Sequence, residues 1–184
     1  MNTFLKVLLN AVSLGIVSLV ALAIVLLAVQ VSAQVPSTIA VPDGTALVTL
    51  HAEGAQIYQC KPDSDVKSPS QVGALTWQFR EPIATLMVDG KSVGRHYAGP
   101  NWDYIDGSGV KGKVAASAPG ATPNDIPWLK LDVVDHRGDG ILSNVSAVQR
   151  INTKGGVAQG SCESAGNYLS VPYSADYVFL RKRD

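Results

Sequence analysis

The chain has 184 residues with 15 basic and 15 acidic side chains, so its formal net charge is zero at pH 7. No bulk positive charge therefore attracts it to nucleic acid or to an anionic membrane surface, and we expect no nucleic-acid partner. Its length and its 46% hydrophobic content are sufficient for one domain with a sizeable core.

The N-terminal residues 1–33 have the pattern of a signal peptide. One charged residue, Lys6, precedes the apolar stretch 11–29, and Val31-Ser32-Ala33 supplies the small residues that signal peptidase reads. We expect cleavage after Ala33, a secreted or periplasmic protein, and a single domain over residues 34–184. The apolar stretch approaches the roughly 20 residues that span a bilayer, so an uncleaved anchor is the alternative and would be the one contact with a membrane.

The remainder of the chain consists of short β-type runs bounded by glycine, proline, aspartate and asparagine, without a long helical pattern. This spacing predicts an all-β domain, an antiparallel β-sandwich or barrel with long loops at 61–72 and 117–125. The ten predicted strands are Ala46–His51, Ala55–Cys60, Leu75–Arg80, Ala84–Val88, Ser92–Tyr97, Asn101–Ile105, Val110–Ala116, Trp128–Val134, Asn144–Ile151 and Tyr168–Leu180.

The two cysteines, Cys60 and Cys162, both follow the leader. An exported chain meets an oxidising compartment, and two cysteines allow one pairing, so we predict a disulfide between them. Two free buried thiols are the alternative. Zinc or nucleophilic chemistry is not indicated, because no cysteine or histidine stands at ligand spacing beside either residue.

The segment 95–114 is the densest in special residues, and its Asp106-Gly107-Ser108-Gly109 sequence predicts a β-hairpin turn. Two registers compete. We favour a three-residue loop, which pairs Asp103 with Lys113 on the wet face and places Trp102 and Val114 on the apolar face. A two-residue loop would mix apolar and charged groups on both faces.

The same hairpin supplies the candidate functional residues. His96 with Asp103 and Asp106 has the groups for acid–base or metal chemistry. Tyr97 and Trp102, with the same two aspartates, would suit a saccharide, whose apolar faces stack on aromatic rings while carboxylates take its hydroxyls. The simpler interpretation is structural: His96 bonds locally, Asp106 forms an Asx turn and Asp103 pairs with a lysine.

A second acidic cluster surrounds the sequence Asp-His-Arg-Gly-Asp-Gly. Asp135 and Asp139 are its candidate calcium ligands, with Asp132 and His136 nearby. The spacing lacks the alternating aspartates of calcium loops, and a hairpin turn accounts for the residues. We therefore predict no metal site and no cofactor.

Several ordered motifs together resemble the domain of unknown function 3455, a family of exported bacterial and fungal proteins. The resemblance covers nearly all of the chain after the leader and implies export and pairing of the two cysteines, without an activity or catalytic residues. The motifs are 56–60 (Gln-Ile-Tyr-Gln-Cys), 96–102 (His-Tyr-Ala-Gly-Pro-Asn-Trp), 106–108, 127–129, 148–153 (Val-Gln-Arg-Ile-Asn-Thr), 155–156, Cys162 and 171–177.

Three functions are consistent with these observations. The favoured hypothesis is a module that binds a saccharide or another small ligand of the cell envelope or extracellular space. The second is an extracellular hydrolase or metal-assisted enzyme that uses His96 with the aspartates. The third is a structural or stress-related envelope protein without a small ligand. No nucleophile elbow or phosphate-binding loop supports an enzyme.

Overall fold

The computed structural model describes residues 34–63 and 74–182. The predicted leader, residues 1–33, and its cleavage site lie outside these residues. The described residues from Val35 onward belong to one compact unit. Within the described part of the chain, no helix is long and apolar enough to cross a membrane.

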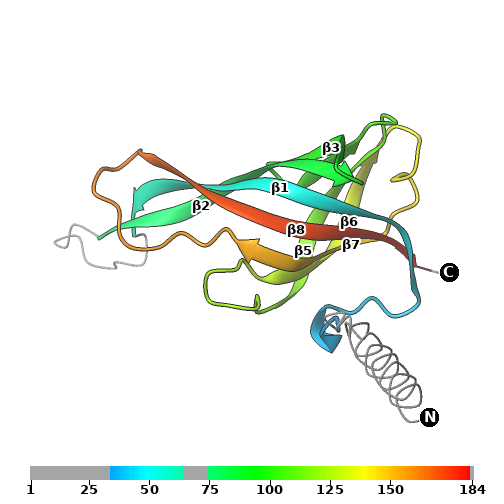
Figure 1. The fold of residues 1–184 in the computed structure, drawn as a ribbon, viewed down its shortest axis with the longest axis horizontal. Coiled ribbons are helices and arrows are strands. Elements are labelled where there is room, and N and C mark those ends of the chain that lie inside the picture. The colour runs from blue at the N-terminus through cyan, green and yellow to red at the C-terminus, as the bar shows by residue number, and fades with distance from the viewer. Residues whose placement is uncertain (1–33, 64–73, 183–184) are drawn as a thin grey trace, which may run out of the picture. The chain divides into compact units, whose positions relative to one another are not determined.

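The eight strands of the described residues form one antiparallel sheet that closes on itself as a barrel (Figure 1). Strand follows strand in sequence order around the barrel, and the first strand pairs with the last. The all-β prediction is confirmed, and of the two architectures expected the barrel is observed. The strands are β1 (Gly44–Pro62), β2 (Leu75–Val88), β3 (Lys91–Tyr97), β4 (Asn101–Tyr104), β5 (Gly109–Ala118), β6 (Trp128–Arg137), β7 (Ala147–Gly155) and β8 (Tyr168–Lys182).

Two pairs of predicted strands are continuous in the structure, which reduces ten runs to eight strands. The first four runs were separated at Gly54 and Pro82, two residues that usually weaken a strand. Gly54 lies against the backbone of β2, where a Cβ atom would stand 2.1 Å from the Ile83 carbonyl oxygen. Pro82 lies beyond the last pair of β2 with β3, which joins Ala84 to His96, so its missing N–H removes no bond to β3.

Both predicted registers of the 95–114 hairpin are wrong. Trp102 pairs with Val110 and Asp103 pairs with Gly109, so the connection spans residues 104–108. The wider loop is held by bonds from the Tyr104 N–H to the Ser108 carbonyl, 2.9 Å, and from the Gly107 N–H to the Tyr104 carbonyl, 3.0 Å. In this register Val114 does not lie opposite Trp102 and is 53% exposed, whereas Trp102 is buried as predicted.

Side chains that alternate along the strands fill much of the barrel interior. Trp102, Tyr177 and Phe179 are its largest members, and Leu50, Leu86, Val110, Leu131 and Val148 pack around them. A second cluster of Ile39, Ala118 and Trp128 lies apart from this core, where the short 3-10 helix η1 (Ser37–Ile39) contacts β5 and β6. There Gln149 Nε2 donates to the Ile39 carbonyl at 2.7 Å.

Three strands continue past the end of the barrel as a ribbon formed by residues 55–62, 75–83 and 168–172. β1 still pairs with β2 and β8 there, whereas β2 has no further pairs with β3, and β7 pairs with β8 only as far as Tyr173 (Figure 1). The predicted disulfide is confirmed: Cys60 in the ribbon is bonded to Cys162, with 5.9 Å between their Cα atoms. It fastens the segment between β7 and β8 to the ribbon.

Candidate functional site

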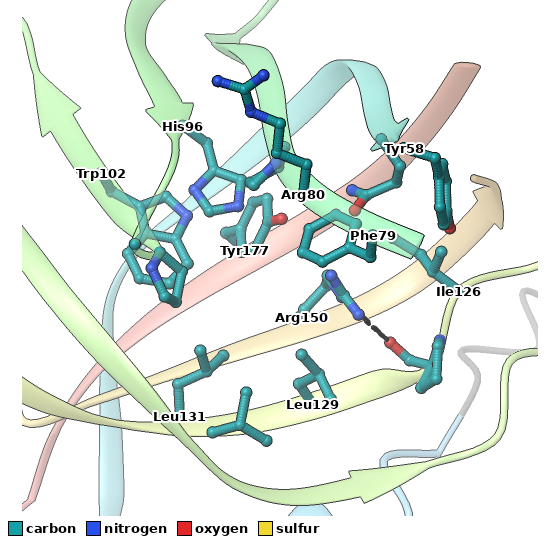
Figure 2. A pocket seen from close by; sticks show the side chains of 16 residues that line it. Tyr58, Phe79, Arg80, His96, Trp102, Ile126, Leu129, Leu131, Arg150 and Tyr177 are labelled. Carbon is teal, nitrogen blue, oxygen red and sulfur yellow. Dashed lines mark hydrogen bonds between the residues drawn. The ribbon is translucent and has the colours of Figure 1, made fainter. Parts of the chain in front are cut away.

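A cavity of about 360 Å³ lies where the ribbon meets the barrel. Figure 2 shows its lining side chains on strands that face one another across the cavity, with the ribbon residues Phe79 and Tyr58 at one end and Trp102 at the other. The lining residues are Gln56, Tyr58, Phe79, Arg80, Pro82, His96, Gly99, Pro100, Trp102, Val114, Ile126, Pro127, Leu129, Leu131, Arg150 and Tyr177.

Polar side chains interrupt the apolar inner face at this end of the barrel. Gln56 continues the inward series of Leu50 and Ala52 on β1 and is 2% exposed. Arg150 follows the fully buried Val148 by two residues on β7 and therefore faces the same way. Inward polar groups in a small barrel are costly, so their gathering around one cavity marks it as the candidate site.

His96 is a titratable group of the cavity that is almost completely buried. Its ring stacks on Trp102, with 4.6 Å between centroids, and lies 4.9 Å from Tyr177. Burial lowers the pKa of His96 to about 3; the bond to Asn101 opposes this shift and the charge of Arg150 adds to it. Because Nδ1 lies 2.8 Å from the Asn101 carbonyl, the proton of the neutral ring is on Nδ1 and Nε2 is an acceptor.

The tyrosines of this region are also held neutral. Burial raises the pKa of Tyr177, whose hydroxyl lies 3.3 Å from that of Tyr173. Burial also raises the pKa of Tyr58, which donates to the Gly156 carbonyl at 2.7 Å. None of these phenols is prepared to act as a base near neutral pH.

The formal charges that line the cavity are two arginines. Arg150 donates from Nε and Nη2 to the Pro127 carbonyl, at 3.1 and 2.9 Å (Figure 2). Arg80 lies at the rim, where its Nε contacts Glu81 at 3.1 Å and its guanidinium stands over the Tyr168 ring. None of the sixteen lining residues is acidic. The electrostatic environment of the cavity is therefore positive.

Of the five residues predicted for a binding site, His96 and Trp102 line the cavity, whereas Tyr97, Asp103 and Asp106 do not. The Asp103 carboxylate forms ion pairs with Arg95, whose Nη2 lies 2.9 Å from Oδ2, and with Arg137, whose Nη2 lies 2.7 Å from Oδ1. Partial burial by itself raises the pKa of Asp103, but the hydrogen bonds from these arginines outweigh it and the net shift is downward. Trp102 is separated from both carboxylates, so the proposed stacking platform is not assembled.

Asp106 forms the expected Asx turn by accepting the Ser108 N–H at 2.9 Å. It also accepts the Ile141 N–H at 2.8 Å, which ties the β4–β5 loop to the β6–β7 loop. The hydroxyl of Ser108 and the Ile141 N–H lower the pKa of Asp106. The simpler structural interpretation of this residue is thus the one that the structure supports.

The second acidic cluster lies on the surface at the end of β6. Asp135 and Asp139 are exposed, and the His136 ring is bonded to the Val145 carbonyl at 2.8 Å. In the described ranges, no group of three or more His, Cys, Asp or Glu side chains is arranged to hold a metal ion.

Sequence reasoning missed Gln56, Tyr58 and Arg150 as site residues. Ile151 faces the second cluster and Val148 faces the barrel, so β7 is apolar on both faces and its pattern does not show which way Arg150 points. One signal was present: all three residues lie in the 56–60 and 148–153 segments on which the family resemblance rests.

Comparison with known proteins gives one match. A family model described as "Protein of unknown function (DUF3455)" matches residues 41–181, which include the whole cavity and both cysteines. No curated protein and no solved structure matches the chain significantly.

Proposed function

The chain belongs to the DUF3455 family of proteins of unknown function, whose description assigns no activity. From the geometry of the site, we propose that the barrel binds a small, largely apolar molecule in its cavity. An eight-stranded barrel has room either for its own side chains or for one small ligand. Here Trp102, Tyr177 and Phe179 fill part of the interior, and the cavity occupies the end beside the ribbon.

The observation that carries the proposal is the composition of the cavity wall. Ile126, Leu129 and Leu131 form an aliphatic side, and Phe79 and Tyr177 provide aromatic rings (Figure 2). Ligand sites of roughly 300–1,000 Å³ are usually walled in this way, with a few polar groups that fix orientation. The volume of about 360 Å³ suits a molecule of two or three rings.

The geometry gives less support to the hydrolase hypothesis and to a saccharide as the ligand. His96 donates to a backbone carbonyl and has no carboxylate partner among the described residues, so the acid–base group required by the hydrolase hypothesis is not assembled. Asp103 and Asp106 are engaged in ion pairs and turn bonds away from the cavity. A saccharide would meet a wall without carboxylates.

We further propose that the protein acts outside the cytoplasm. The Cys60–Cys162 disulfide supports this location, because structural disulfides persist in oxidising compartments. Sequencing the N-terminus of the exported protein tests the expected cleavage after Ala33; a chain that begins at Met1 would contradict it.

The ligand proposal is tested with the neutral fluorescent probe N-phenyl-1-naphthylamine. We expect saturable binding of one probe per chain, measured by the rise in fluorescence and by calorimetry. Leu129→Trp fills the cavity from its wall and should abolish binding. Val134→Trp on the exposed face of the same strand is the matched control and should bind normally. Absence of saturable binding to the wild type would overturn the proposal and favour a structural role.

A further inference from the structure

Arg150 is a half-buried cation at an inward position of the barrel. Its neighbours across the sheet are Leu129 on β6 and the buried Tyr177 on β8. A charge that faces an apolar interior is costly unless an opposite charge or sufficient hydrogen bonds offset it. The partners of Arg150 therefore decide whether the site is complete without a ligand.

The protein itself neutralises little of this charge. The Pro127 carbonyl accepts from Arg150 Nε and Nη2, and the Tyr177 hydroxyl is a further hydrogen-bond partner of the guanidinium, but both partners are neutral. No carboxylate of the described residues is bonded to Arg150, since Asp125 accepts the Gly155 N–H and Asp176 accepts from Asn152 and contacts His51. Arg80, the other arginine of the cavity, differs because it has Glu81 beside it.

Two further donors of the cavity lack partners. Trp102 Nε1 and Gln56 Nε2 are buried and have no hydrogen-bond partner within the described structure. Buried N–H groups are almost always satisfied, so two orphans in one cavity wall indicate acceptor atoms that a ligand brings. The third unpaired atom, Trp128 Nε1, belongs to the second cluster, outside the cavity.

We propose that the ligand is a monocarboxylate on a flat apolar body, with its carboxylate bound to Arg150. This inference rests on the proposed function, since it specifies the occupant of the same cavity. One cation without an acidic partner matches one negative charge, and the planar guanidinium matches a carboxylate. The absence of acidic lining residues disfavours amines.

The test is a competition between two molecules with the same rings, 2-naphthoate and 2-naphthamide, each displacing N-phenyl-1-naphthylamine at pH 7.5. We expect the carboxylate to compete about tenfold or more better than the amide, as a charge-assisted bond requires. Arg150→Gln should abolish this preference, and Arg150→Lys should retain most of it. Arg181→Gln makes the same charge change on the exposed end of β8 and should leave the preference unchanged.

Each outcome separates the two proposals. If the neutral probe binds but naphthoate competes no better than naphthamide, or does not compete, the carboxylate inference is overturned and the small-ligand function stands. If the neutral probe does not bind to the wild type, the proposed function itself fails. The wild-type comparison decides the inference even if Arg150→Gln does not fold. An unchanged preference in a folded Arg150→Gln variant also overturns it.

Discussion

His96 connects the cavity to the acid stability of the whole protein. Its ring is enclosed by Trp102 and Tyr177 and is neutral in the folded state, with a pKa of about 3, whereas the unfolded chain binds a proton near pH 6.5. A group whose charged form is disfavoured by folding stabilises the protein above the higher pKa. That stabilisation is lost as the pH falls toward the lower one.

We therefore predict that the free energy of unfolding decreases by roughly 1.5 kcal/mol between pH 6.5 and 5 through His96 alone. His96→Phe preserves an aromatic ring against Trp102 and should lack this decrease, as measured by urea unfolding at pH 7, 6 and 5. His51→Phe, which changes an exposed histidine, is the control. Identical pH slopes for the wild type and His96→Phe would contradict the assignment.

At the residue scale, sequence reasoning succeeded where an interaction is local. The Asx turn of Asp106 involves Ser108, two positions away, and the burial of Trp102 follows from alternation within its own strand. Arg150 could not be placed, because its significance depends on which face of β7 closes over the cavity. Which face of β7 this is depends on its pairing with β6 and β8, not on the residues beside Arg150 in the sequence.

At the scale of single elements, backbone contact between β1 and β2 explains both the merged strands and a strict requirement for glycine. A Cβ atom on Gly54 would lie 2.1 Å from the Ile83 carbonyl oxygen and 2.5 Å from the Ala84 Cα. Neither backbone atom can move without disturbing the ladder of β2. The residue that looked like a strand end is thus a point where the backbones of two long strands lie in close contact.

Gly54→Ala should destabilise the protein by about 3 kcal/mol, since overpacking against backbone is poorly relieved. Guanidinium unfolding monitored by circular dichroism measures the change. Glu53→Ala, at the neighbouring position with an exposed side chain, should shift the free energy of unfolding by less than about 0.5 kcal/mol. A Gly54→Ala variant as stable as Glu53→Ala would show that β1 and β2 tolerate a wider separation.

The hairpin register shows why connections between elements were the weakest prediction. Turn residues gave the position of the β4–β5 loop, but its length is set by side-chain bonds of Asp106 to Ser108 and to Ile141 in another loop. Asp103 likewise pairs with Arg137 of β6, a partner that no pairwise analysis of the hairpin contains.

At the scale of the whole molecule, the disulfide joins two parts of the chain that border the cavity. Cys60 belongs to the ribbon, and Cys162 belongs to the segment that also supplies the Gly156 carbonyl to Tyr58. The sequence was sufficient for this prediction, as for the fold class, because compartment and cysteine count leave one pairing. Closure of the sheet was not predictable, since it depends on the first strand meeting the last.

Replacing both Cys60 and Cys162 by serine should cost on the order of 4–5 kcal/mol in the loop-entropy model, because the bond closes a loop of 102 residues. Guanidinium unfolding of the oxidised wild type and of the double variant measures the difference. Reductant should destabilise the wild type and leave the double variant unchanged. Equal stability of the oxidised and reduced wild type would contradict this prediction.

The pairing of β1 with β8 also determines when the polypeptide is able to fold. His51 lies opposite Asp176, 125 positions later, so β1 obtains its second neighbour only when the last strand is available. Contacts of such long sequence separation form slowly, and an incomplete chain has open edges on β1 and β7 that invite intermolecular pairing. Closure of the barrel therefore requires the final strand, and a chain that lacks β8 leaves β1 and β7 without one of their neighbours.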